Sequence, residues 1–100
     1  MIFSEHKKEV AKLTIKEKYQ EIYYRVCVEN QEKYHKLTLQ NNKTHDENIF
    51  LLCFKKLKEY VEILDNDGKL ENEMRQLYFS DARACIRMIE KFLDTNNWIL

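Results

Sequence analysis

Apolar side chains recur every three or four residues along most of this chain, and this spacing constrains the fold more than any other feature. Steps of three and four place side chains on one face of an α-helix, whereas a half-buried β-strand needs strict alternation. The clearest series is Ile15, Tyr19, Ile22 and Val26, and the same spacing continues through the polar Asn30 to Tyr34 and Leu37. Folds rich in β-turns also use glycine and proline often, and the chain has one Gly and no Pro. The sequence therefore predicts an all-α fold.

The first helical segment is unusually long. It runs from about Ser4, whose hydroxyl can cap the helix, to about Gln40. A straight helix of that length would extend about 55 Å, against about 30 Å for the helices that follow, at ~1.5 Å per residue. Either it breaks near residues 26–30, where β-branched side chains and Asn30 lower helix propensity, or part of it overhangs. A break gives four helices, and an overhang leaves an apolar stripe that a second copy would cover.

A capping box marks the start of the second helix. In Thr44-His45-Asp46-Glu47, the threonine can accept from the backbone of Glu47 while the glutamate reaches back to the backbone of Thr44. This helix continues to about Leu64, and a third runs from about Lys69 to Asp94. The sequence therefore predicts a three- or four-helix up-and-down bundle with short loops, formed by residues 1–100 as a single domain. Because residues 49–54 are all apolar, we expect the second helix at the centre of the bundle.

The charge of the chain is balanced, with 17 basic and 17 acidic residues. A protein that binds nucleic acid without sequence preference needs a basic surface to displace counterions, so no nucleic-acid partner is expected. Opposite charges four residues apart support a helix, and Glu21 with Arg25 and Glu29 with Lys33 have this spacing. We expect these pairs to lie on a solvated face.

The three cysteines, Cys27, Cys53 and Cys85, form no CxxC pair, and the histidines form no HxxxH pair. The sequence therefore predicts no metal site and no resident cofactor. An odd number of cysteines and an N-terminus without an apolar signal segment are typical of a reducing cytoplasmic setting. The longest apolar run, residues 49–54, is too short to span a membrane. We expect all three cysteines to pack as small hydrophobic residues, and Cys85, between Arg83 and Arg87, has the surroundings closest to those of a thiolate.

Two pairs of acidic residues support an alternative interpretation, in which the chain is an enzyme. Glu29-x-x-Glu32 and Glu62-x-x-Asp65 each share a helix face, and two such pairs on neighbouring antiparallel helices could hold Mg²⁺. This arrangement resembles the all-α nucleotide pyrophosphohydrolases of the MazG family. The resemblance covers these four residues, and the doubled glutamate usual in that family is absent because Val28 precedes Glu29. It implies a magnesium-dependent hydrolase of nucleotides.

Aromatic residues support the other interpretation, in which the chain binds a protein partner. Tyr23 and Tyr24 are adjacent and point about 100° apart on a helix, so both do not fit one core face. Trp98 stands with Ile99 and Leu100 in an apolar tail after the third helix. Tyr and Trp are enriched among the residues that dominate protein interfaces. The sequence therefore predicts that these five residues contact a partner, and packing of each back onto the bundle is the alternative.

These features together predict a small intracellular protein-binding module with no catalytic residues. It would act as a regulator, adaptor or inhibitor, and its partner would be another protein or a second copy of the chain. Lys, Asn, Ile and Tyr are abundant while Ala, Arg and Gly are scarce, a bias typical of AT-rich genomes. We therefore expect a source such as a low-GC bacterium, its phage or a large DNA virus, and the small size of the chain also fits a module encoded by a phage or mobile element.

Overall fold

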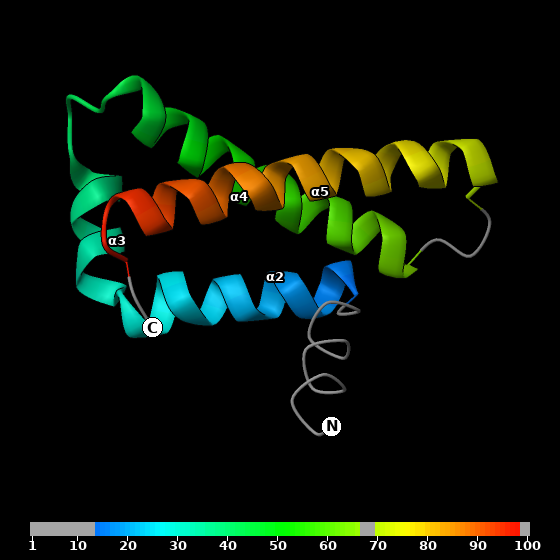
Figure 1. Ribbon diagram of the computed structural model, residues 1–100, viewed down its shortest axis with the longest axis horizontal. Coiled ribbons are helices and arrows are strands. Elements are labelled where there is room, and N and C mark those ends of the chain that lie inside the picture. Colours follow the sequence, from blue (N-terminus) through cyan, green and yellow to red (C-terminus); the bar gives the residue numbers. More distant parts are fainter. Residues whose placement is uncertain (1–13, 67–69, 99–100) are drawn as a thin grey trace, which may run out of the picture.

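The computed structural model describes residues 14–66 and 70–98. They form α2 (Ile15–Tyr23), the π-helical segment η1 (Tyr24–Glu29), α3 (Gln31–Leu39), α4 (His45–Asn66) and α5 (Asn72–Thr95). These two ranges contain no strand, so the prediction of an all-α helical bundle is confirmed. Figure 1 shows α2 and α5 running in one direction and α4 in the other, while α3 lies across one end of the bundle.

Capping boxes open both α2 and α4. At α4, Thr44 Oγ1 accepts from the Glu47 backbone N–H at 3.1 Å and Glu47 Oε1 accepts from the Thr44 N–H at 2.7 Å, as predicted. The same reciprocal pair joins Thr14 and Glu17 at the start of α2. Ser4, the N-cap predicted from the sequence, lies outside the described residues. The sequence does not predict this second box, because Thr14 stands between the apolar residues Leu13 and Ile15.

The long first segment breaks at Asn30, close to where the sequence predicts a break. The Asn30 backbone N–H donates to the Arg25 carbonyl, five residues back, at 3.1 Å, which is the wide turn of a π-helix. The Asn30 side-chain amide donates to the same carbonyl at 2.8 Å. With its backbone at φ −118° and ψ 35°, Asn30 leaves helical geometry, and α3 starts in a new direction.

The core lies where α2, α4 and α5 meet. Its buried apolar side chains are Ile22, Val26, Leu37, Phe50, Phe54, Leu57, Val61, Ala82, Cys85, Ile86, Ile89, Phe92, Leu93 and Trp98. Each of α2, α4 and α5 packs against the other two, so α4 does not have the central position that its apolar start predicts, and Leu52 near that start is half exposed. None of the helices within the described ranges combines the length and the apolar composition needed to cross a lipid bilayer.

Candidate protein-interaction surface on the first helix

The outward side of α2 and η1 exposes three large apolar side chains. Tyr23, Tyr24 and Val28 are 48%, 51% and 50% exposed. Tyr24 and Val28 are four residues apart on the helix, so they lie on one face, and Tyr23 adjoins them. The other exposed large apolar residues of the described ranges are Leu39, Leu52, Met74, Leu77 and Met88. Because none of these is aromatic, both exposed aromatic side chains of the described ranges lie in this surface of Tyr23, Tyr24 and Val28, which we call the tyrosine face.

The Tyr24 hydroxyl lies near an acidic neighbour on the same segment. The Glu29 carboxylate, a potential acceptor for this hydroxyl, is the main reason that the pKa of Tyr24 is raised. The two residues are five apart, a spacing that the wide turn of a π-helix brings to one side. Tyr24 is therefore exposed and lies beside a carboxylate.

Tyr23 forms the outer edge of an aromatic cluster that leads into the core. Its ring lies 6.1 Å from that of Tyr19, and the Tyr19 ring lies 6.1 Å from that of Phe54. Tyr34 of α3 approaches Phe54 edge-on at 5.8 Å. Burial raises the pKa of both Tyr19 and Tyr34. The tyrosine face is thus continuous with the packing that joins α2, α3 and α4.

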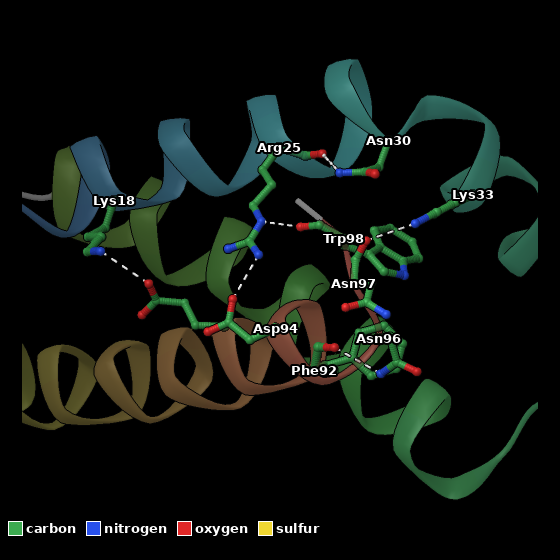
Figure 2. Close-up of polar contacts among 10 residues, drawn as sticks. Lys18, Arg25, Asn30, Lys33, Phe92, Asp94, Asn96, Asn97 and Trp98 are labelled. Atoms are coloured by element: carbon green, nitrogen blue, oxygen red, sulfur yellow. Dashed lines mark hydrogen bonds and ion pairs between the residues drawn. The ribbon is translucent and has the colours of Figure 1, made fainter. Parts of the chain in front are cut away.

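On its inward side the same segment is tied to the end of α5. The Arg25 guanidinium contacts Asp94 Oδ1 at 2.8 Å and donates through Nε to the Trp98 carbonyl, while Lys33 Nζ donates to the Asn97 carbonyl at 2.9 Å (Figure 2). The last turn of α5 has no basic residue of its own. A helix C-terminus carries partial negative charge and unpaired carbonyls, so Arg25 and Lys33 supply the missing cations from other helices. We call these contacts the C-terminal clamp.

The C-terminal clamp corrects one prediction. The Arg25 side chain, expected on a solvated face beside Glu21, is only 16% exposed and pairs with Asp94. A sequence signal for this contact existed. Lys18 and Arg25 are seven residues apart and share a helix face, and Glu90 and Asp94, four residues apart, also share one. Lys18 Nζ lies 3.2 Å from Glu90 Oε2 (Figure 2). The neighbouring sequence does not indicate which helix these charged side chains contact.

Trp98, predicted to contact a partner, lies instead in the core. It is 6% exposed, and its ring lies 5.4 Å from that of Phe50 and 5.8 Å from that of Phe92. The cause is the end of α5, where Asn97 has φ 60° and the Trp98 N–H donates to the Leu93 carbonyl at 2.8 Å. This is the Schellman arrangement, which turns the chain back over its helix.

The remaining predicted contact residues, Ile99 and Leu100, lie outside the described residues. Of the five, the structure therefore leaves Tyr23 and Tyr24 as exposed candidates and adds Val28. A valine followed by a charged residue carries no sequence signal for exposure, and its position became clear only from the π-helical turn.

The four acidic residues of the MazG-like pattern do not converge. Asp65 Oδ2 lies 3.2 Å from Lys16 Nζ, at the start of α2, whereas Glu29 is the last residue of η1. Lys16 and Glu29 are thirteen residues apart along the helix, which is roughly 20 Å at ~1.5 Å per residue. Within the described ranges, no group of three or more His, Cys, Asp or Glu side chains could hold a metal ion. The geometry that the resemblance requires is therefore not formed by these residues.

The cysteines pack largely as predicted. Cys85 is buried, while Cys27 and Cys53 are half-buried. Burial and the neighbouring Cys53 raise the pKa of Cys85 to about 11, so Cys85 is not a thiolate. Arg83 and Arg87 do not change this because both are exposed and line a surface hollow beside Phe79.

The tyrosine face and the C-terminal clamp thus lie on two sides of one helical segment. The first side is exposed, and the second is held by contacts with the end of α5. Any function has to be inferred from this arrangement and from the chemistry of its residues. Comparisons of the chain with protein-family models, with curated proteins and with solved structures found no match.

Proposed function

We propose that this chain is a protein-binding module, a regulator, adaptor or inhibitor of another protein, and that the tyrosine face is part of its contact surface. One observation carries the proposal: Tyr23, Tyr24 and Val28 are each about half exposed on adjoining positions of one helical segment. Tyrosine offers a large, amphipathic contact area and is enriched among the residues that dominate binding energy.

The rigidity of the segment supports the proposal. Binding costs free energy for every group that must be ordered. The C-terminal clamp holds the opposite side of the segment through Arg25. A partner would therefore meet a surface whose backbone is held in place before contact. Segments of π-helix also occur frequently at functional sites.

The size of the tyrosine face indicates how far the contact extends. A stable interface buries about 800 Å² on each partner, which is more than three half-exposed side chains supply. Gln20 and Glu21, which are also exposed on α2, would enlarge it, and further exposed residues around them would supply the rest of the area. We expect an apolar centre on the partner for the rings and hydrogen-bond donors at its rim for the Glu21 and Glu29 carboxylates.

The partner is expected to be another protein or a second copy of this chain, and the contact is expected in the cytoplasm, including that of a cell infected by a phage. Sedimentation equilibrium over a range of concentrations distinguishes a second copy of the chain from another protein as the partner. If the partner is a second copy, the wild type forms a dimer and Tyr24→Ser with Val28→Ser restores the monomer, whereas Leu52→Ser on α4 leaves the dimer intact.

If the wild type is a monomer, site-specific photo-crosslinking tests the remaining case. A photoreactive phenylalanine analogue is placed at Tyr24 or, as the matched control, at the equally exposed Leu52, and the chain is expressed in its native host. We expect one discrete adduct from position 24, lost when Val28→Asp is added, and none from position 52. A monomer that yields no adduct at position 24, or identical adducts at both positions, contradicts the proposal.

A further inference from the structure

Two cysteines face each other across the α4–α5 pair. The rings of Tyr60 on α4 and Tyr78 on α5 lie 5.8 Å apart, which fixes the register of these two antiparallel helices. Cys53 precedes Tyr60 by seven residues and Cys85 follows Tyr78 by seven residues. Seven residues are two helical turns and return to the same face, so the cysteines meet at one level of the interface.

The two thiols are close enough to influence each other and differ in accessibility. Cys53 is among the causes that raise the pKa of Cys85, in agreement with the shared level that the helix register gives them. Cys53 is half-buried and packs against the edge of the core, whereas Cys85 belongs to the core itself. Cys27 lies elsewhere, on η1 beside Tyr19 and Tyr34.

From this geometry we propose that Cys53 and Cys85 form a reversible disulfide that ties α4 to α5 when the chain meets a low-molecular-weight disulfide. Cys53, the more accessible thiol, attacks one sulfur of the oxidant as a thiolate, forms a mixed disulfide and releases one thiolate. Cys85 then attacks the Cys53 sulfur, and the second half of the oxidant leaves. The two protein thiols lose two electrons and two protons, and the oxidant becomes two thiols. Intramolecular disulfides of this kind in reducing compartments are typically transient and redox-sensing.

The buried surroundings of Cys85 make its attack on the mixed disulfide the slow step. In the reduced chain, burial and the Cys53 thiol raise the pKa of Cys85 to about 11. In the mixed disulfide the Cys53 thiol is no longer present, but burial, the largest cause, still raises the pKa of Cys85. Because only a thiolate attacks, closure of the mixed disulfide is slow at neutral pH. This inference is independent of the proposed binding surface, because Cys53 and Cys85 lie on helices that contribute none of its residues.

Mass spectrometry of the full chain tests the disulfide directly. The reduced protein is incubated with oxidised glutathione, its remaining thiols are alkylated, and the intact mass is measured. We expect one alkylated cysteine instead of three, the loss of two hydrogen atoms, and a peptide that joins residues 53 and 85. The bond closes a loop of about 30 residues, and the melting temperature should rise by about 10 °C or more and return after treatment with dithiothreitol.

Three variants resolve the steps, with circular dichroism as the check on folding. Cys27→Ser should oxidise as the wild type does. Cys85→Ala should stop with one glutathione on residue 53, and Cys53→Ser should leave residue 85 unmodified. The proposal is overturned if the wild type keeps three alkylatable thiols, if it keeps a glutathione adduct that never closes, or if its disulfide includes Cys27. The wild-type result decides the matter even if Cys85→Ala fails to fold.

Discussion

Replacing Arg25 by Met removes the centre of the C-terminal clamp while keeping most of the apolar stem of the side chain. Two contacts are lost: the ion pair with Asp94 and the hydrogen bond to the Trp98 carbonyl. The Asp94 side chain is 72% exposed, so solvent screening limits the ion pair to less than ~1 kcal/mol. A hydrogen bond from a charged donor to a partly buried carbonyl contributes about 1.5 kcal/mol or slightly more.

We therefore expect Arg25→Met to lower the free energy of unfolding by about 2 kcal/mol. For a domain of this size that corresponds to a fall in melting temperature of roughly 10 °C. The assay is urea unfolding followed by circular dichroism at 222 nm. Lys16→Met is the matched control because it also removes one side-chain cation that pairs with a carboxylate. Lys16 Nζ lies 3.2 Å from Asp65 Oδ2, but both side chains are about half exposed. That control should cost less than ~0.5 kcal/mol.

Equal and small effects of Arg25→Met and Lys16→Met would refute the reasoning, because they would mean that Arg25 is no more engaged than an ordinary surface cation. A double-mutant cycle with Asp94→Ala separates the two contacts. The coupling between residues 25 and 94 should account for less than half of the loss caused by Arg25→Met, and the remainder belongs to the Trp98 carbonyl.

Three further predictions concern caps, cysteine and magnesium. Thr44→Ala removes half of a capping box and should cost about 1 kcal/mol in urea unfolding, whereas Thr44→Ser should cost much less. The pKa of Cys85 is raised from 9.0 to about 11 in the folded chain. The protonated thiol therefore contributes fully to the free energy of unfolding below pH 9, and this contribution is lost as the pH rises towards 11. Between pH 8 and 11 the urea midpoint of Cys85→Ala should fall less than that of the wild type. Calorimetric titration with Mg²⁺ and a nucleoside triphosphate should give heats of dilution alone, because Asp65 of α4 pairs with Lys16 at the start of α2 whereas Glu29 lies at the end of η1. A saturable heat would contradict this geometry.

The helical architecture could be predicted because its causes are local. The stripe through Ile22, Val26 and Leu37 follows helical spacing, and all three side chains are buried. The Thr44 box is a four-residue pattern, and the weakness near Asn30 follows from side-chain branching and from the tendency of asparagine to bond to its own backbone. Each of these signals acts within about one helical turn.

The sites could be predicted only in part because they depend on distant pairings. Arg25 was assigned to Glu21, four residues away, whereas its partners are sixty-nine and seventy-three residues away. The direction of Trp98 depends on the positive φ of Asn97, a conformation that asparagine tolerates but does not require. A tail of three apolar residues has the same sequence pattern whether it packs on the core or contacts another protein.

Fluorescence of Trp98 tests the central claim most directly, because the chain contains one tryptophan. The claim is that the end of α5 is folded into the core by the C-terminal clamp, which leaves the tyrosine face as the contact surface. We predict an emission maximum shifted well to the blue of the urea-unfolded chain and weak quenching by acrylamide, both lost together in the unfolding transition. Emission and quenching in native buffer equal to those of the unfolded chain would contradict it.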